Sequence, residues 1–259
     1  MKDINQKNAL FLDNILNKFK VNIEKKARKV LPDDLKQMYY SAFYKFGQAL
    51  VEANSCQKIN PKFVIDEVNS ELYKTLMRYF TNQPFEEKIL FPLVSKSGQP
   101  VKDNNKIIKS KWEIDKGLLI IGSSGRGKDL TLKIFNTINF YFEETQAMQH
   151  KKINCSDVVM GYSEHGDKHF NNYREGICYF ADLGDENKSS SNYANKLEVM
   201  REMIMIRYEL WIKNKTITHF TTNLDAFQLY ERYGERAFFR LFEMCNFCVM
   251  QGENKRIQK

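Results

Sequence analysis

The sequence predicts an α/β fold with a parallel five-stranded sheet that is flanked by helices and preceded by a helical N-terminal region. Three observations lead to this prediction. Apolar residues recur at helical spacing within residues 1–82. From residue 112 onward, short apolar runs alternate with helical patterns, which is typical of a parallel sheet with right-handed crossovers. A glycine-rich loop separates the first of these runs from the helix after it.

Composition and charge exclude some classes of protein. The chain has 259 residues, of which 42% are hydrophobic, and this is ordinary for a soluble globular protein. No apolar run reaches the about 20 residues that a membrane-spanning helix needs, and the N-terminus has no signal-peptide pattern. We therefore expect a cytoplasmic protein with no membrane partner. The formal net charge of +8 favours a polyanionic partner such as nucleic acid.

The N-terminal part is expected to form at least two helices. One helical face is formed by residues at spacings of four, three and four, namely Tyr39, Phe43, Phe46 and Leu50. Asn60 and Pro61 resemble the N-cap and first residue of a second helix. Its apolar stripe is expected to contain Val64, Val68, Leu72 and Leu76. Such stripes usually form core, and here they are also candidates for docking a partner helix.

Changes in composition set the expected domain boundaries. Residues 1–94 form the helical N-terminal region, to which we assign partner binding. Residues 95–111 are polar and basic and contain glycine and proline, so we expect a linker or surface loop. Residues 112–259 form the α/β domain.

Five short apolar runs are expected to form the sheet. They are residues 117–121, 152–155, 177–181, 216–221 and 246–250. The first run is continuously apolar, as expected of a strand that is buried on both faces. We expect Ser156 to cap the helix after the second strand, and residues 195–213 to form one long helix.

The loop after the first strand matches a phosphate-binding motif. The loop and the start of its helix consist of Gly122, Ser123, Ser124, Gly125, Arg126, Gly127, Lys128, Asp129 and Leu130. The spacing G-x-x-x-x-G-K between a strand and a helix is the Walker A core, in which backbone N–H groups surround a phosphate. We expect these nine residues to bind ATP, with Lys128 reaching its β- and γ-phosphates.

The last position of the motif departs from the pattern. Ser or Thr normally stands there, because its hydroxyl binds Mg²⁺, but this chain has Asp129. Two like charges about 4 Å apart repel by roughly 4 kcal/mol at an effective dielectric near 20, unless a cation intervenes. Asp129 therefore either binds the metal itself or weakens nucleotide binding.

Three later segments resemble motifs of one family. Residues 177–186, Ile-Cys-Tyr-Phe-Ala-Asp-Leu-Gly-Asp-Glu, are similar to the Walker B motif of the DnaC/IstB group of AAA+ ATPases. Residues 221–224, Thr-Thr-Asn-Leu, resemble its sensor-1 segment, and residues 233–244 resemble the Y-G-x-R-x-x-x-R-L segment that carries its arginine finger. Together with the phosphate loop, the resemblance covers about residues 115–255. It implies an AAA+ P-loop NTPase core of the helicase-loader or transposition-accessory kind, without a C-terminal helical lid.

The resemblance also implies roles for individual residues. Lys128 matches the Walker lysine, and Asp182 matches the second acidic position, which polarises the attacking water. Asn223 matches sensor 1, which orients that water. Arg240 best matches the arginine finger that acts on ATP in a neighbouring subunit, and Arg236 is the second candidate. The family pattern thus implies a homo-oligomer with ATP and Mg²⁺ that acts on single-stranded DNA or on a replicative helicase.

A second departure lies in the acidic motif. Ala181 stands where the family has the aspartate that holds Mg²⁺ through water. Two hypotheses remain open. In one, Asp129 and Asp182 bind Mg²⁺ in an altered site that still hydrolyses ATP. In the other, the chain is a degenerate pseudo-ATPase that serves as a nucleic-acid or protein adaptor. A metabolic P-loop kinase is disfavoured, because it needs no arginine finger for another subunit.

Two further groups of residues have less specific interpretations. Asp185, Glu186 and the serines at 189–191 are expected to form a surface loop. Cys245 and Cys248 form a C-x-x-C without a second ligand pair nearby, so we expect reduced thiols rather than a zinc site.

Overall fold

The computed structural model describes most of the chain, and its contacts define two compact units. The described residues are 29–54, 62–83, 90–92, 102–103, 106–107, 109–186, 190–192 and 195–255. The first unit, here called the helical unit, contains residues 1–84 and 129–149. The second, the sheet unit, contains residues 85–128 and 150–259. Each unit is described by itself.

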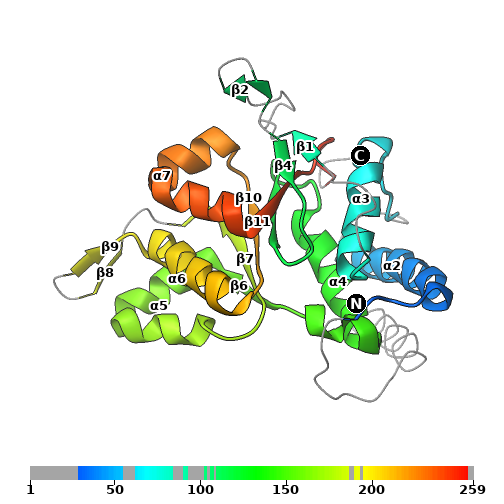
Figure 1. Cartoon of the computed structure of the whole chain (residues 1–259), viewed down its shortest axis with the longest axis horizontal. Helices are drawn as coiled ribbons and strands as arrows, with labels where there is room; N and C mark the ends of the chain where they lie inside the picture. The colour runs from blue at the N-terminus through cyan, green and yellow to red at the C-terminus, as the bar shows by residue number, and fades with distance from the viewer. Residues whose placement is uncertain are drawn as a thin grey trace. The chain divides into compact units, whose positions relative to one another are not determined.

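The helical unit has an aromatic core. Its elements are α2 (Asp33–Asn54), α3 (Glu67–Phe80), α4 (Lys128–Tyr141) from its second residue onward, and the 3-10 helix η1 (Glu143–Met148) (Figure 1). The ring of Phe135 on α4 lies 4.7 Å from that of Phe43 and 4.2 Å from that of Phe80, between centroids. The Tyr39 hydroxyl donates to Asn139 Oδ1 at 2.7 Å. The expected helical face of α2 is confirmed, because all four of its residues are buried.

The start of α3 differs from the prediction. Residues 62–66 are not helical, and Asp66 is the N-cap, with a side-chain oxygen that accepts from the Asn69 N–H at 3.0 Å. The expected cap at residues 60–61 is outside the described residues. Val64 and Val68 are 58% and 61% exposed, so the predicted stripe is wrong in its first half. The reason is that Val64 precedes the helix and Val68 lies in its first turn.

The sheet unit contains a five-stranded parallel sheet, as predicted. The strand order is β11-β5-β10-β7-β6. These strands are β5 (Gly117–Ile121), β6 (Lys151–Asn154), β7 (Cys178–Leu183), β10 (Thr218–Thr222) and β11 (Cys245–Val249). The central strand, β10, therefore separates β5, which leads into the phosphate loop, from β7, which carries the acidic motif.

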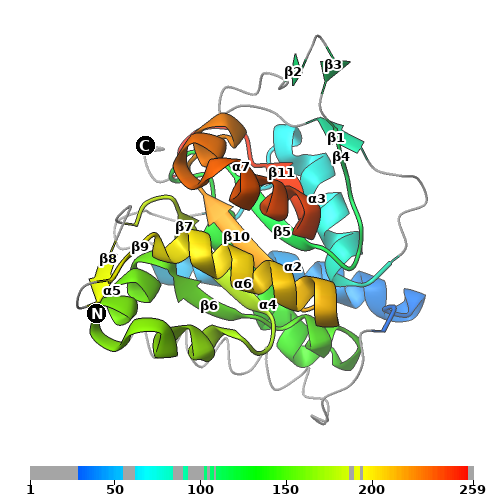
Figure 2. The ribbon, with the colours of Figure 1, turned by 60° about the vertical axis from the view of Figure 1, so that its left-hand side comes forward.

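Three helices of the sheet unit cover one face of the sheet. They are α5 (Cys155–His165), α6 (Val199–Asn214) and α7 (Ala226–Met244) (Figures 1 and 2). Apolar side chains from four neighbouring strands form the core against them, namely Leu119, Phe180, Phe220 and Phe247. This arrangement confirms the predicted α/β fold class.

Local details of the sheet unit correct two expectations. The strand β9 (Asn195–Leu197), which pairs with β8 (Ser190–Asn192), occupies the first residues of the long helix expected from residue 195. Ser156 does not cap α5, because the N-cap is Asn154 and α5 already begins at Cys155. Two other short antiparallel pairs join β1 (Leu90–Pro92) with β4 (Lys109–Lys111), and β2 (Lys102–Asp103) with β3 (Lys106–Ile107).

A fully buried arginine fastens α6 to the sheet. Arg207 donates to Thr218 Oγ1 at 2.7 Å and to the carbonyls of Tyr173, Gly176 and Ile217 at 2.8–3.0 Å. Its burial lowers the pKa of its guanidinium. Because a guanidinium has donors in a rigid planar fork, one side chain satisfies several carbonyls at the start of the sheet.

The two cysteines of the C-x-x-C face in opposite directions. The Cys245 thiol contacts the Thr218 carbonyl, whereas the Cys248 thiol contacts the Leu119 carbonyl. Residues three apart in a strand point to opposite faces of a sheet. Their place in β11 therefore prevents the two sulfurs from sharing one metal ion.

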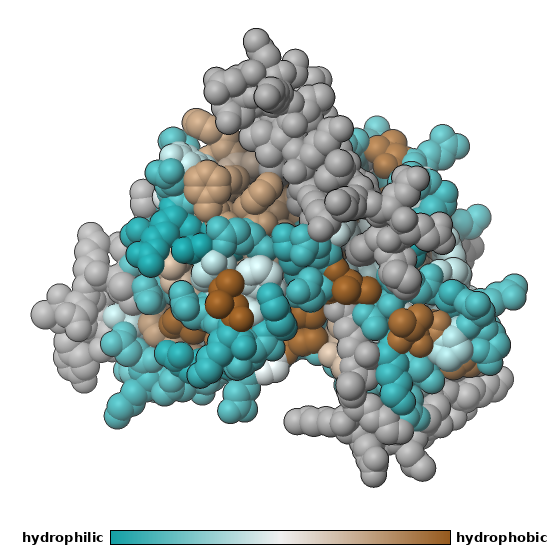
Figure 3. Space-filling view, in the orientation of Figure 1, coloured by the Kyte–Doolittle hydropathy of each residue, from teal (hydrophilic) through white to brown (hydrophobic). Residues whose placement is uncertain are grey.

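The face of the molecule that Figure 3 shows is rich in hydrophilic residues. On the face in Figure 3, hydrophobic residues lie in small groups among hydrophilic ones. Among the helices that the structure describes, none combines the length and the hydropathy that crossing a membrane requires.

Candidate nucleotide-binding site

The candidate site lies at the carboxyl edge of the sheet. In parallel α/β sheets, ligands bind outside the carboxyl ends of the strands. The loop after β5 and the turn after β7 both begin at this edge, and β10 ends between them. Asn223 directly follows β10, so it is placed beside both the phosphate loop and the acidic segment.

The glycines of the phosphate loop are required by its geometry. Gly125 and Gly127 have φ values of +81° and +94°, in the region that L side chains rarely adopt. At Gly122 the backbone passes close to the C-terminal strand, and an added Cβ would lie 2.7 Å from the Met250 carbonyl oxygen. The Gly122 N–H donates to the Thr222 carbonyl at 3.1 Å, which fastens the start of the loop to β10.

Lys128 is the first residue of α4, and its side chain folds back onto the loop. Its buried Nζ donates to the carbonyls of Gly122 at 2.6 Å and Ser123 at 3.2 Å, and to Asn223 Oδ1 at 2.8 Å. An ammonium group has three donors, and here three neutral oxygens accept from it. Phosphate oxygens are stronger acceptors for a cationic donor. The loop therefore fits a phosphate group, whose oxygens would replace these three oxygens as acceptors from Lys128.

A β-bulge places Asp182 at the site. Phe180 pairs with Phe220 and Leu183 pairs with Thr222, so two residues of β7 lie opposite Thr221 alone. Asp182 has a φ of +58°, and its N–H donates to Thr221 Oγ1 at 3.2 Å. The bulge lets Leu183 join the core on the side of Phe180, and it leaves Asp182 exposed.

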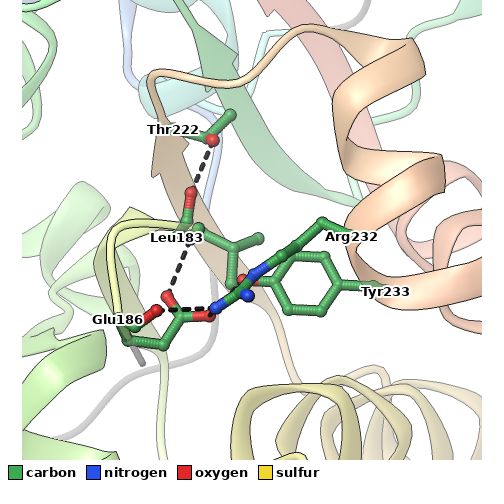
Figure 4. Close-up of polar contacts among 6 residues, drawn as sticks. Leu183, Glu186, Thr222, Arg232 and Tyr233 are labelled. Carbon is green, nitrogen blue, oxygen red and sulfur yellow. Dashed lines mark hydrogen bonds and ion pairs between the residues drawn. The ribbon is translucent and has the colours of Figure 1, made fainter. Parts of the chain in front are cut away.

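The turn after Asp182 is anchored by a buried carboxylate, contrary to the prediction of a surface loop. The Glu186 side chain is only 2% exposed. It accepts from the Gly184 N–H at 2.8 Å, from the Tyr233 hydroxyl and from Arg232 (Figure 4). The expectation was wrong for Glu186, because α7 supplies donors far away in the sequence. Asp185 is exposed as expected, but its Oδ2 accepts from Asn223 Nδ2 at 2.8 Å.

The remaining predicted nucleotide and metal residues lie in the first turn of α4. Asp129 and Leu130 follow Lys128 there and belong to the helical unit. No cluster of three or more His, Cys, Asp or Glu side chains suited to a metal occurs within the described ranges. Protein sites for Mg²⁺ usually supply one or two carboxylates, with substrate phosphates and water completing the shell. Asp182, in the sheet unit, thus fits as a ligand only together with a bound nucleotide.

The two arginine-finger candidates differ in their surroundings. Arg240 donates to the Tyr208 hydroxyl at 2.7 Å and to Glu243 at 2.9 Å, and its guanidinium lies 4.1 Å from the Tyr208 ring centroid. Arg236 is exposed and lines a shallow groove together with Arg240 and Glu243. Burial and the neighbouring Glu243 raise the pKa of Tyr208.

The segment after β11 contacts the phosphate loop, and sequence reasoning missed it. The Lys255 N–H donates to the Gly125 carbonyl at 3.0 Å, and Arg126 Nη1 donates to the Met250 carbonyl at 3.1 Å. The Asn254 side chain lies so close to Gly125 that an added Cβ would overlap with it. No motif marks Asn254 or Lys255, because the contacts are mostly to backbone atoms and depend on the fold.

The fold and the site together define an α/β domain with a P-loop. This domain combines a parallel sheet, a glycine loop that leads into a helix, and a lysine that donates to the residue after the central strand. This class agrees with the resemblance that the motifs carry.

Comparisons with known proteins place the chain as follows. The sequence matches no protein-family model and no curated protein. DnaA from Aquifex aeolicus bound to AMPPCP is 14% identical with a TM-score of 0.45, over 74% of this chain and 50% of that one. A proposed primosome component from Streptococcus pyogenes serotype M3 is 12% identical with a TM-score of 0.47, over 83% and 97%. A DNA replication initiation factor is 13% identical with a TM-score of 0.44, over 74% and 49%. The chain spans about half the length of the first and third of these structures.

Proposed function

We propose that this chain is an ATP-binding AAA+ protein that resembles helicase loaders and transposition accessory ATPases. It assembles around ATP and acts on DNA or on a replicative helicase. The observation that best supports this proposal is the 2.8 Å contact between Lys128 Nζ and Asn223 Oδ1. It joins the phosphate loop to the position that resembles sensor 1.

The proposal gives this contact a role in nucleotide binding. The β- and γ-phosphates of ATP accept hydrogen bonds from Lys128 Nζ. These bonds replace those that Nζ donates to the carbonyls of Gly122 and Ser123 and to the amide of Asn223. Asn223 Oδ1 becomes an acceptor for the attacking water, while Asp182 polarises that water. Asp129 and Asp182 would hold Mg²⁺, which when bound would supply positive charge beside the phosphates.

Oligomerisation and partner binding complete the proposed function. Arg240 acts on ATP of a neighbouring copy after it leaves Glu243, and Arg236 is the second candidate. Residues 1–94 bind the partner, and residues 95–111 connect them to the ATPase domain at 112–259. The positive net charge supports DNA as a partner.

The experiment that tests this function measures ATP binding by calorimetry and ATP hydrolysis with and without single-stranded DNA. Lys128→Met should weaken ATP binding by at least about tenfold, because it removes a charge-assisted hydrogen bond to phosphate. Binding to the unmodified chain should weaken when EDTA removes Mg²⁺. Equal ATP affinity of Lys128→Met and the unmodified chain would exclude this loop as the nucleotide site.

A degenerate pseudo-ATPase adaptor is the second candidate. It is favoured by the buried methyl group of Ala181 at a position that carries an aspartate in the family. Restoring the family pattern with Asp129→Thr and Ala181→Asp separates the two. In a rewired site, each single change lowers ATP turnover and the double change restores it. In an adaptor, the unmodified chain has no turnover that Lys128→Met could abolish.

A further inference from the structure

The amide of Asn223 bridges two groups of opposite hydrogen-bonding character. Its Oδ1 lies 2.8 Å from Lys128 Nζ, and its Nδ2 lies 2.8 Å from Asp185 Oδ2. A lysine ammonium only donates, and an ionised carboxylate only accepts. The orientation of the amide is therefore dictated by its two partners: the NH₂ must face Asp185 and the oxygen must face Lys128.

Asp185 is held beside Asn223 by a tight turn. Its N–H donates to the Asp182 carbonyl at 3.1 Å, and Gly184 between them has a φ of +101°. Positive φ at this third position is what a type II turn requires, and glycine adopts it most readily. A Cβ at Gly184 would also overlap with the Leu224 side chain, so the turn packs closely on the segment after β10.

A buried anchor fixes the far side of the same turn. The Glu186 carboxylate accepts from the Gly184 N–H, and α7 holds this carboxylate through Arg232 and Tyr233 (Figure 4). The hydrogen bonds of Gly184 and Glu186 thus fix the position of the Asp185 backbone, although the Asp185 side chain is exposed. The hydrogen bond from Asn223 meets an acceptor whose position is already determined.

We propose that Asp185 is a positioning residue that keeps the oxygen of Asn223 facing the nucleotide. This inference rests on the proposed function, in which phosphate takes Lys128 away from Asn223. Asp185 still holds Nδ2 after that exchange, so the amide cannot turn over and present its NH₂. Oδ1 then accepts a hydrogen bond from the attacking water. Asp185 acts only through Asn223 and does not touch the nucleotide.

Two substitutions at one exposed position test the proposal. Asp185→Asn keeps an oxygen acceptor at the same distance from the backbone, whereas Asp185→Ala removes it. Substitutions at exposed sites usually change the free energy of unfolding little, and urea denaturation checks this. The assay measures kcat and KM for ATP hydrolysis by the full chain. The side-chain amide of Asn223 is followed by NMR on protein labelled with ¹⁵N-asparagine, and its signal is assigned by its loss in Asn223→Ser.

Positioning predicts a specific pattern. Asp185→Ala should lower kcat about tenfold, as a misplaced group does, while KM changes by less than about twofold. Asp185→Asn should keep kcat near that of the unmodified chain. The Asn223 amide protons should exchange with water faster in Asp185→Ala than in Asp185→Asn.

Other results overturn the inference. They are an unchanged kcat in Asp185→Ala, or an equal loss of kcat in both variants. If the unmodified chain does not hydrolyse ATP, the enzymatic part of the proposed function fails, and the NMR measurement still decides the bridge. An Asn223 amide signal that is identical in Asp185→Ala and the unmodified chain then rejects the positioning role.

Discussion

The hydroxyl of Tyr233 donates a 2.5 Å hydrogen bond to the buried carboxylate of Glu186. Arg232 donates to the same carboxylate at 3.2 Å, so two neighbouring residues of α7 hold the turn beyond β7. Burial, followed by the charge of Glu186, raises the pKa of Tyr233. The hydroxyl therefore stays protonated, and remains a donor, at neutral pH.

Substitutions in this cluster should lower stability to different degrees. Tyr233→Phe should lower the free energy of unfolding by about 1–2 kcal/mol, because it removes one hydrogen bond to a charged group. Glu186→Leu should cost about 3 kcal/mol or more, because it leaves Arg232 partly buried without its carboxylate. Urea denaturation measures both. Tyr230→Phe, at a partly exposed position of α7, is the control, and an equal effect of Tyr230→Phe and Tyr233→Phe would contradict the prediction.

Even a conservative substitution of Arg207 should lower the free energy of unfolding. Arg207→Lys keeps the charge but has a single nitrogen, which cannot reach Thr218 and three separate carbonyls. We expect a loss of about 3 kcal/mol or more in the free energy of unfolding, because buried carbonyls lose their donor. The exposed Arg201→Lys on the same helix should change it by less than about 0.5 kcal/mol. Matching unfolding curves for the two variants would show that the buried network is not needed.

Gly125→Ala should weaken ATP binding more than backbone strain alone explains. The new methyl group would collide with Asn254 in addition to adopting a φ of +81°. Gly176→Ala is a matched control, because its φ is +67° and, among the described residues, no atom lies within 4 Å of the added Cβ. Calorimetry should show weaker ATP binding only for Gly125→Ala, and Asn254→Gly should partly restore it. Unchanged affinity in Gly125→Ala would rule out close packing at the loop.

A mixing experiment tests whether an arginine acts on a neighbour. Lys128→Met and Arg240→Ala should each be inactive alone, because one lacks its own phosphate contact and the other lacks the finger. Mixed chains should regain ATP hydrolysis, since intact phosphate loops then meet intact arginines. Arg236→Ala is run in parallel, because Arg236 is exposed while Arg240 is paired with Glu243. Recovery with Arg236→Ala and full activity of Arg240→Ala would assign the role to Arg236.

The thiols should be unreactive in the folded protein. Burial raises the pKa of Cys155, Cys178, Cys245 and Cys248, and the thiolate is the reactive form. Cys56 lies outside the described residues, so the experiment uses a Cys56→Ser variant. A thiol reagent at pH 8 should label none of the other four cysteines in buffer and all four in urea. Rapid labelling of one cysteine without denaturant would reveal local opening around that residue.

The strands and the phosphate loop were predictable because their signals are local. The apolar run at 117–121 is a strand with the expected bounds, and glycine and lysine spacing marked the loop. The burial of Glu186 was not predictable, since a glutamate beside serines indicates solvent until Arg232 and Tyr233 are brought to it. The same holds for Asn254, whose neighbour Gly125 is distant in sequence. The start of α3 was misplaced because Asn60 and Pro61 carry a local cap signal, whereas the N-cap in the structure is Asp66.

The bulge in β7 also decides which residue of the acidic motif meets solvent. Two consecutive residues, Ala181 and Asp182, lie opposite Thr221 alone. Ala181 stays buried in the strand, whereas Asp182, with its φ of +58°, is exposed at the carboxyl edge of the sheet. An aspartate at position 181 would therefore have its carboxylate where the strand now buries a methyl group, and an unpaired charge is costly to bury.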